Sequence, residues 1–325
     1  MSQLITRREA LRLGIVGGGA AFLVACRGNG EVTATAAPTA GASAAPTPIM
    51  LVHEAGTTTL QTPATKLGIM QWQIAEALLA LGIQPTALSD EQQPGSGNPF
   101  PEHLKGKITG YKSLGSRITP NLEVLASTQL DLIIADRNEH QKDYDAFTKI
   151  APTVLQDTNS YKKLIPNFDQ IAQATGTQSR ATPVKQALAD DIAKVKAKAG
   201  GKAGARVLVG IFTPDRIFAY FADSFQGELM QDLGTTYAYR GNPAAPTEAI
   251  GLEALPAVNA DVYIWLAYTG PTVLDTFKDS PLWTNLPPVK NKRSFVVSRE
   301  VWGLGRGVIA VKQMAAQAVG FLYPA

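Results

Sequence analysis

The stretch that decides the fold runs Thr182-Pro-Val-Lys-Gln-Ala-Leu-Ala-Asp-Asp-Ile-Ala-Lys-Val-Lys-Ala-Lys-Ala199. Its apolar side chains recur every three or four residues, which predicts one buried stripe on an α-helix with Lys and Asp on the other side. Thr182 and Pro183 are typical of a helix start, and Gly200 and Gly201 of a helix end. At 1.5 Å per residue this helix would be about 27 Å long, roughly the width of a small domain.

The segments before and after this helix match each other in order. Glu, Leu and Gly have the same spacing in 76–82 and in 228–234. Eight residues separate Glu from Asp in two further matched segments, 123–131 and 253–261. Two ordered pairs of matches predict an internal duplication, and therefore two similar α/β lobes joined by one long helix. We expect the lobes at 49–180 and 202–325, with the joining helix at 181–201.

Within each lobe, short apolar runs bounded by turn residues predict strands, and longer runs with helical spacing predict helices. In the first lobe we expect strands at 49–53, 57–60, 66–70 and 130–135, and helices at 74–81, 121–127, 144–150 and 165–175. In the second lobe we expect strands at 206–211, 218–221, 262–266 and 294–297, and helices at 227–233 and 308–321.

The first 25 residues read as an export signal. The segment Thr6-Arg-Arg-Glu-Ala-Leu-Arg12 resembles a twin-arginine signal, and the apolar run at 13–25 is too short to span a bilayer as a mature helix. Leu23-Val-Ala-Cys26 resembles a bacterial lipobox, in which Cys26 carries a lipid and begins the mature chain. The resemblance implies export and a lipid anchor on the outer face of the cell membrane. The alternative is an uncleaved anchor with an incidental cysteine.

Composition excludes several classes of protein. Cys26 is the single cysteine of 325 residues, so no internal disulfide can stabilise the fold. Residues 26–48 are rich in Ala, Thr, Pro and Gly and predict a flexible tether. Without residues 1–25 the formal charge falls from +3 to +1, because three Arg and one Glu are lost. A near-neutral chain with no basic cluster is a poor nucleic-acid binder.

No pattern of residues predicts an enzyme or a resident metal or cofactor. The chain has no Gly-x-Ser-x-Gly elbow and no cysteine nucleophile. His53, His103 and His140 are scattered and lack metal-ligand spacing. The run at 303–307 (Gly-Leu-Gly-Arg-Gly) departs from the dinucleotide fingerprint and is interpreted as a tight turn into a helix.

Five segments carry a family resemblance that covers 49–323: 72–82 (WQIAEALLALG), 115–123 (GSRITPNLE), 131–135 (DLIIA), 280–283 (SPLW) and 301–307 (VWGLGRG). Together they resemble the iron–siderophore substrate-binding lipoproteins of ABC importers, which have ferric hydroxamate-, ferric citrate-, haem- and cobalamin-binding relatives. The resemblance implies two α/β lobes bridged by one long helix, with the ligand in a cleft between them. It also implies a monomer that delivers a ferric siderophore to an ABC permease dimer with a cytoplasmic ATPase.

A bulky and often anionic ferric siderophore calls for aromatic walls and arginine forks. The resemblance assigns ligand contact to Arg117, within the matched segment 115–123. In open α/β sheets ligands lie beyond the carboxyl ends of strands, and the other candidates follow expected strands: Trp72, Arg137, Arg216, Tyr268, Trp302 and Arg306. We expect Trp72 and Trp302 in the cleft, Trp265 in the core, and Trp283 packed against the helix that follows it. Arg137 and Arg306 could equally cap loops, and the first amides of the closing helix would favour an anion.

Glu123 and Glu253 occupy equivalent positions in the two repeats, each at an expected helix start. In the family such glutamates contact permease arginines, so we expect them to dock the permease. The alternative is that both are solvated and favour the helix dipole. Haem, cobalamin or ferric citrate remain alternative cargoes, and a surface enzyme or sensor on a related scaffold remains the alternative class. We expect lobe closure to be small, because the joining helix has no internal Gly and Pro at its start alone.

Overall fold

The structure is a computed structural model that describes residues 47–91, 101–198, 204–241, 247–268 and 270–323. The export signal, Cys26, most of the tether, and Gly200 with Gly201 lie outside these residues. None of the helices in the described ranges has the length and apolar character needed to cross a membrane.

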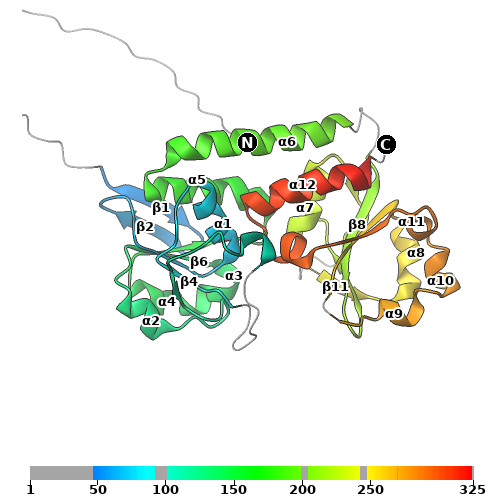
Figure 1. Ribbon diagram of the computed structural model, residues 1–325, viewed down its shortest axis with the longest axis horizontal. Helices are drawn as coiled ribbons and strands as arrows, with labels where there is room; N and C mark the ends of the chain where they lie inside the picture. Colours follow the sequence, from blue (N-terminus) through cyan, green and yellow to red (C-terminus); the bar gives the residue numbers. More distant parts are fainter. Residues whose placement is uncertain (1–46, 92–100, 199–203, 242–246, 269, 324–325) are drawn as a thin grey trace, which may run out of the picture. The chain divides into compact units, whose positions relative to one another are not determined.

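The first lobe contains a two-stranded hairpin and a five-stranded parallel sheet (Figure 1). The hairpin pairs β1 (Ile49–His53) with β2 (Gly56–Leu60), as the sequence predicts. The sheet has the order β5-β4-β3-β6-β7 and comprises β3 (Leu67–Ile69), β4 (Ala87–Leu88), β5 (Lys112–Ser113), β6 (Leu132–Asp136) and β7 (Thr153–Gln156). The helices of the lobe are α1 (Trp72–Ala80), α2 (Leu122–Ser127), α3 (Arg137–His140), α4 (Tyr144–Thr148) and α5 (Leu164–Thr175), with 3-10 turns at Glu102–Leu104, Gln141–Asp143 and Tyr161–Lys163.

The second lobe contains a mixed sheet with the order β11-β9-β8-β12-β13, and β10 also pairs with β8. Its parallel strands are β8 (Arg206–Phe212), β10 (Thr236–Tyr237), β12 (Val262–Leu266) and β13 (Ser294–Val297), and β9 (Ile217–Tyr220) and β11 (Thr247–Ile250) are antiparallel to their neighbours. The helices are α7 (Phe225–Asp232), α8 (Leu255–Val258), α9 (Leu274–Phe277), α10 (Pro281–Thr284), α11 (Pro287–Lys290) and α12 (Val308–Leu322), with a 3-10 turn at Leu252–Ala254 and a π-helical turn at Glu300–Leu304.

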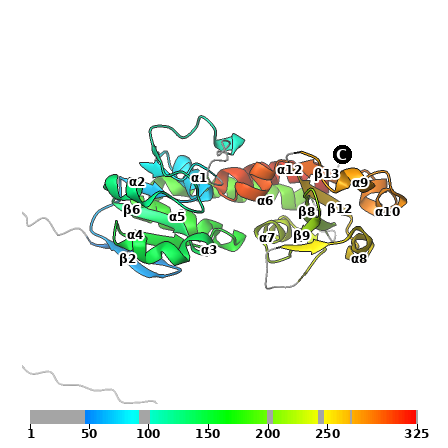
Figure 2. The ribbon, with the colours of Figure 1, turned by 90° about the horizontal axis from the view of Figure 1, so that it is seen from below.

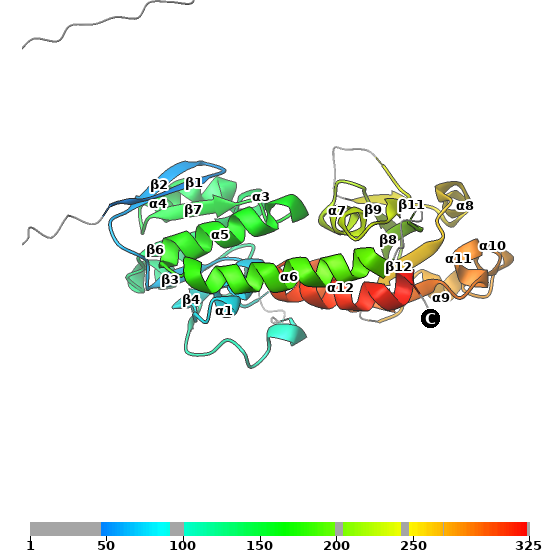
Figure 3. The same ribbon diagram turned by 90° about the horizontal axis from the view of Figure 1, so that it is seen from above.

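One helix, α6 (Gln178–Lys198), joins the two lobes and lies alongside α12 (Figure 2, Figure 3). It begins four residues before the predicted start, so the prediction of Pro only at its start is wrong. The first turn closes on the carbonyl of Thr177, which accepts from the N–H groups of Arg180 and Ala181 at 2.9 and 3.2 Å. Pro183 therefore lies inside the helix, where it has no N–H to donate.

The repeated sequence positions make the same main-chain contacts in both lobes. Asp131 donates its N–H to the Lys66 carbonyl at 2.8 Å, and its carboxylate accepts from the Lys66 N–H at 2.9 Å. Asp261 makes the same two bonds with Arg206, both at 2.8 Å. Each aspartate thus holds the start of the central strand of its own sheet.

The Glu-Leu-Gly repeats also end their helices alike. Gly82 and Gly234 follow α1 and α7 with φ of 71° and 90°, a region that favours glycine. In both, the residue after the glycine donates its N–H to a carbonyl of the helix. Ile83 donates to Leu78 at 2.8 Å, and Thr235 donates to Met230 at 3.2 Å. The structure therefore gives α1 and α7 matching ends, although β9 lies between β8 and α7 in the second lobe.

A single apolar cluster runs through both lobes. Leu188, Ile192 and Val195 of the predicted α6 stripe are buried in it. It also contains Leu51 of the hairpin and Val297 of β13, which belong to different lobes. The joining helix and α12 are therefore part of the core and not an external strut.

Short elements account for most of what the sequence did not predict. Strands β4, β5 and β10 have two residues each, and β7 and β11 have four. Helices α8 to α11 have four residues each. A period of 2 or 3.6 cannot be recognised over such short segments.

We expect Asp131→Ala and Asp261→Ala each to lower the free energy of unfolding by about 1–2 kcal/mol at pH 7, measured by urea titration. Burial alone would raise the pKa of Asp131, but hydrogen bonds from Thr65 and Lys66 outweigh it and lower the pKa. The Arg206 side chain lowers the pKa of Asp261. A lowered folded-state pKa gives stability that is present above the ordinary aspartate pKa and is lost as the pH falls through the folded value.

The cost of both substitutions should therefore shrink between pH 5 and pH 3. Asp279→Ala, at an exposed aspartate, is the matched control. A cost that is the same at both pH values would contradict the role given to the carboxylates.

Candidate functional site

The parallel strands of the first lobe bring several polar loops to one edge of the sheet. β3 ends before Gln71 and Trp72, β6 ends at Asp136, and β7 ends before Asp157. Because carboxyl ends of parallel strands share an edge, these side chains come together. This edge, with the loop before α12, is the candidate binding cleft.

Trp72 is the first residue of α1, and its indole is buried. The indole Nε1 donates to the Ser89 carbonyl at 3.1 Å. The guanidinium of Arg117 lies 5.8 Å from the centre of the ring, within cation–π range. Two candidates from the sequence are thus in contact.

Arg117 is held by a network that the sequence did not reveal. Its Nη1 donates to Glu139 Oε1, and Gln71 Nε2 donates to Glu139 Oε2 at 2.7 Å. The His140 ring contacts the Arg117 carbonyl at 2.6 Å through Nε2. Glu139 therefore both positions Arg117 and neutralises its charge.

Asp136 fixes the backbone on which Glu139 of this network lies. Its carboxylate is buried and accepts from Thr158 Oγ1 at 2.6 Å, Thr158 N–H at 3.2 Å and Glu139 N–H at 3.0 Å. These bonds cap α3 and tie the end of β6 to the loop after β7. The positions of Glu139 and of the loop at 157–159 depend on each other.

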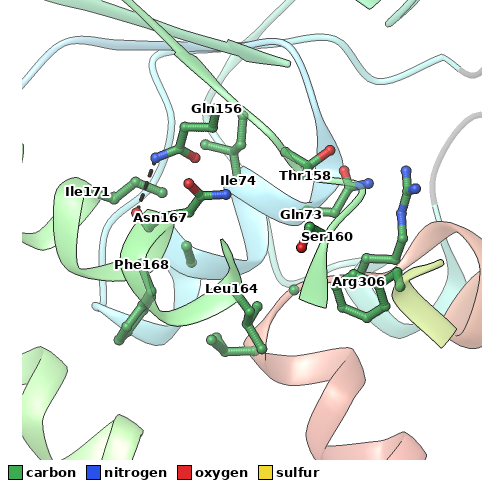
Figure 4. Close-up of a pocket in the computed structure, with 14 residues that line it drawn as sticks. Gln73, Ile74, Gln156, Thr158, Ser160, Leu164, Asn167, Phe168, Ile171 and Arg306 are labelled. Atoms are coloured by element: carbon green, nitrogen blue, oxygen red, sulfur yellow. Dashed lines mark hydrogen bonds between the residues drawn. The ribbon is translucent and has the colours of Figure 1, made fainter. Parts of the chain in front are cut away.

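Arg306 reaches the site from the loop before α12 (Figure 4). Its Nη1 donates to Asn159 Oδ1, and the Gln73 amide, turned to satisfy both of its atoms, accepts from Nε at 3.0 Å and Nη2 at 2.7 Å. Burial lowers the pKa of Arg306, and part of the side chain stays exposed. Among the described residues no carboxylate lies within ion-pair distance of it.

A small cavity lies beneath Arg306. It has a volume of about 20 Å³, enough for about one water molecule. Its polar lining includes Gln156 and Asn167, which are joined by a bond from Gln156 Nε2 to the Asn167 carbonyl at 3.1 Å (Figure 4). The seam between the lobes is therefore closely packed at this point.

The remaining candidates from the sequence lie outside the contacts made by Arg117 and Arg306. Arg137 pairs with Glu54 at 3.3 Å and with Asp157 at 3.4 Å. Arg216 is exposed in the turn between β8 and β9 and pairs with Asp215 at 2.9 Å. Tyr268 is exposed after β12, which is parallel to β8, so it lies at the same edge of the sheet as Arg216. In the described part of the chain no hydrogen bond links Arg216 or Tyr268 to Arg306.

The expectation that Trp302 lines the cleft is wrong. Its ring is fully buried in the core, and Nε1 donates to Gln317 Oε1 at 2.6 Å. The π-helical turn after β13 folds back onto α12 and places the indole against that helix. Trp265 is a core residue, as expected, and Trp283, which lies within α10, packs in the same cluster.

The first amides of α12 are also unavailable to a ligand. The Ala310 N–H donates to Glu76 Oε2 at 2.8 Å, so the anion at this helix start belongs to the chain itself. The expectation that an external anion binds at the start of α12 is therefore wrong.

Two polar residues of the second lobe were not selected from the sequence. Tyr220 ends β9, and burial raises its pKa, while Arg306 and Arg299 act to lower it. Arg299 follows β13 and is partly exposed, with no carboxylate at ion-pair distance among the described residues. No group of three or more His, Cys, Asp or Glu in the described ranges is arranged to hold a metal ion.

Glu123 and Glu253 are both exposed. Glu123 lies in the first turn of α2, which Asn121 caps. Glu253 lies in a 3-10 turn, where an α-helix start was expected. The two positions are equivalent in sequence but differ in local geometry.

The profile of the periplasmic binding protein family matches residues 69–300. The chain is 29% identical to the Fe(3+)-citrate-binding protein YfmC of Bacillus subtilis, over 84% of this chain and 86% of that protein. It is 30% identical to the putative ABC transporter substrate-binding lipoprotein YhfQ of the same organism (80% and 84%), and 25% identical to the Fe(3+) dicitrate-binding periplasmic protein FecB of Escherichia coli (82% and 87%).

Solved structures share the fold. The petrobactin-binding protein YclQ of Bacillus subtilis matches with a TM-score of 0.74 at 20% identity, over 86% of this chain and 100% of that one. SirA of Staphylococcus aureus, complexed with staphyloferrin B, matches with a TM-score of 0.72 at 22% identity (82% and 96%). These likenesses confirm the predicted α/β architecture of two lobes joined by a long helix.

We expect Trp302→Phe to lower the unfolding free energy by about 1–2 kcal/mol, because it removes a buried hydrogen bond and leaves a small void. Affinity for cargo should stay within a factor of about 2, since the ring does not reach the cleft. Calorimetric unfolding and titration of the same samples would measure both. Weaker cargo binding with an unchanged free energy of unfolding would show that Trp302 contacts the ligand.

Proposed function

The chain belongs to the periplasmic binding protein family, and on this premise we propose that it captures an anionic ferric chelate of the siderophore type and delivers it to an ABC importer. The family is one of substrate-binding proteins. The cargo, the residues that hold it and the permease contacts are argued below as parts of this proposal.

The observation that carries the proposal is the state of Arg306. A largely buried guanidinium is costly when no carboxylate of the described residues lies within ion-pair distance: Asp136 and Glu139 act on it only from further away, and two amide oxygens replace only part of its hydration. A negatively charged ligand in the cleft would supply the missing charge, and the guanidinium fork fits chelating carboxylate oxygens.

The charges of the two lobes support one orientation of the ligand. In the first lobe Arg117 is already paired with Glu139, and Arg137 with Glu54 and Asp157. In the second lobe Arg299 and Arg306 have no such partners in the described residues. The most negative side of the ligand would therefore face the second lobe.

The names of the relatives favour a carboxylate-rich cargo. YfmC and FecB are named for ferric citrate, and YfiY of Bacillus subtilis is named as a probable siderophore-binding lipoprotein. Ferric citrate and carboxylate siderophores share the oxygen donors that arginine recognises. In this proposal the iron arrives chelated, because the site offers guanidinium and amide groups and these bind the chelator.

We propose an extracytoplasmic location, with Cys26 lipidated and residues 26–48 acting as the tether. Export by the twin-arginine route rests on the segment at 6–12. Relatives named as a lipoprotein and as a periplasmic protein support the location outside the cytoplasm. The partners would be a permease dimer and its ATPase.

Arg306→Ala should weaken cargo binding by about 1.5–3 kcal/mol, the usual contribution of a charge-assisted hydrogen bond. Arg117→Ala should cost a similar amount. Arg117→Lys should recover little, because an ammonium cannot bond Glu139 and lie flat over Trp72 at once. Isothermal titration with ferric citrate, a panel of ferric siderophores, haem and cobalamin would measure the changes.

The control for this experiment is Arg240→Ala, at an exposed arginine of the second lobe. Unchanged affinity in Arg306→Ala, for a chelate that the unaltered protein binds, would overturn the proposed charge pairing. Binding of haem or cobalamin alone would select one of the alternative cargoes.

The double variant Glu123→Ala, Glu253→Ala should bind cargo normally and fail to support uptake. Exposed ion pairs contribute about 0–1 kcal/mol each, so these glutamates would set orientation and encounter rate more than affinity. Uptake of radiolabelled iron chelate at matched expression is the measurement, with exposed Glu248→Ala as control. Normal uptake by the double variant would remove both residues from permease docking.

A further inference from the structure

The repeated glutamate, in α1 and in α7, makes contacts outside its own lobe. Glu76 in α1 and Glu228 in α7 occupy the same position of the Glu-Leu-Gly repeat. Both carboxylates are buried. Neither is close to the candidate docking glutamates in sequence, and neither was assigned a role from the sequence.

Glu76 belongs to the first lobe and binds the last helix of the second lobe. Its Oε2 accepts from the Ala310 N–H in the first turn of α12, and its Oε1 contacts His103 Nε2 at 3.1 Å. Burial raises the pKa of Glu76. We call Glu76, His103 and Ala310 the first latch.

Glu228 belongs to the second lobe and binds the start of the last helix of the first lobe. Its Oε2 accepts from Ser160 Oγ at 3.0 Å and from the Lys162 N–H at 3.2 Å, and its Oε1 pairs with Lys162 Nζ at 2.9 Å. The 3-10 turn at Tyr161–Lys163 leads directly into α5. We call Glu228, Ser160 and Lys162 the second latch.

The two latches are reciprocal. Helix α5 follows β7 and helix α12 follows β13, and both strands are the last of their sheets in chain order. Each glutamate therefore satisfies unpaired N–H groups at the start of the other lobe's last helix, where a carboxylate also meets a favourable helix dipole. The glutamate that is repeated in the two lobes therefore joins each lobe to the other.

The first latch is sealed within the protein. The side chains of Glu76 and His103 are 0% and 4% exposed. A Cβ atom on Gly307 would lie 2.6 Å from the Glu76 Cβ, so the backbone before α12 is in close contact with this glutamate. Breaking this latch would leave a buried carboxylate without its partners, which is costly.

The second latch borders solvent on its Lys162 side. The Lys162 side chain is 77% exposed, and Glu228 and Lys162 line a groove of about 720 Å³ between α5, α6 and α7. The groove contains Tyr161, whose hydroxyl donates to Asp232 at 2.7 Å and whose ring meets Phe225 edge-on. The Glu228 side chain itself is only 8% exposed, but water in the groove reaches the Lys162 ammonium beside it, so opening this latch costs less than opening the first.

We propose that the two repeated glutamates are unequal interlobe latches: Glu76 is the fixed pivot, and Glu228 is the latch that opens when the lobes move. The groove between α5, α6 and α7 would then widen or narrow with the angle between the lobes. This device is independent of the identity of the cargo.

Amide hydrogen exchange tests the device in the protein without cargo. Glu228→Ala should raise the exchange rate of the Lys162 amide, in the opposite lobe, by about tenfold, the factor that corresponds to about 1.4 kcal/mol. The Ala310 amide should be unaffected. Glu248→Ala, an exposed glutamate of the same lobe, should change neither rate.

Spin labels report the lobe motion directly. In the full chain with Cys26→Ser, labels at exposed Ala126→Cys and Ala257→Cys place one probe on each lobe. Glu228→Ala should broaden the distance distribution between them. Glu76→Gln keeps the shape and an acceptor oxygen, so it should fold and leave the distribution narrow.

Three results would overturn the proposal. The first is an unchanged Lys162 exchange rate in Glu228→Ala, and the second is an unchanged width of its distance distribution. The third is equal broadening by Glu76→Gln and Glu228→Ala, which would remove the difference between pivot and opening latch. Because no cargo is present, none of these results bears on the ligand proposal.

Discussion

The two lobes share one apolar core, and the other features of the protein depend on this constraint. Leu188 and Ile192 of α6 and Val311 and Met314 of α12 lie in the same buried cluster as Leu51 of the first hairpin. Pulling the lobes apart would expose this surface at roughly 25 cal/mol per Å². This packing limits how far the lobes can move apart, and Arg306 is fixed across the seam by Asn159.

A closely packed seam limits the freedom of the charged side chains along it. Side chains in a rigid frame lose little further freedom when a ligand binds, so each correctly placed donor contributes more to affinity. Glu139 illustrates the opposite role, since it holds Arg117 in place while reducing its charge. Glu139 thus sets both the position and the charge of Arg117, whereas Arg306 is positioned by amide oxygens that leave its charge in place.

The sequence predicted those parts of the structure that are decided locally or by repetition. The apolar stripe of α6, the hairpin and the strands β8 and β12 were recognisable because each is long enough to show its period. The matched aspartates Asp131 and Asp261 signalled the duplication, and the structure gives them matching contacts.

Other features could not be predicted because they depend on distant partners. A tryptophan that follows a strand can face a cleft or turn back onto a helix, and Trp302 does the latter because Gln317 accepts its N–H. Glu139 was overlooked although it follows the expected strand by a few residues, since nothing local shows that Arg117 is its partner. Asn159 follows β7, a strand too short to recognise.

The reciprocal glutamates also bear on how the chain acquires its structure. Glu76 is 234 residues away from Ala310, and Glu228 is 68 from Ser160. When a chain emerges with its N-terminus first, α12 must be made before the Glu76 carboxylate can accept from the Ala310 N–H. Contacts of such long range slow folding, because the loop entropy is lost before the contact forms. The contact between Glu76 and Ala310 can therefore form only after the C-terminal helix has been made.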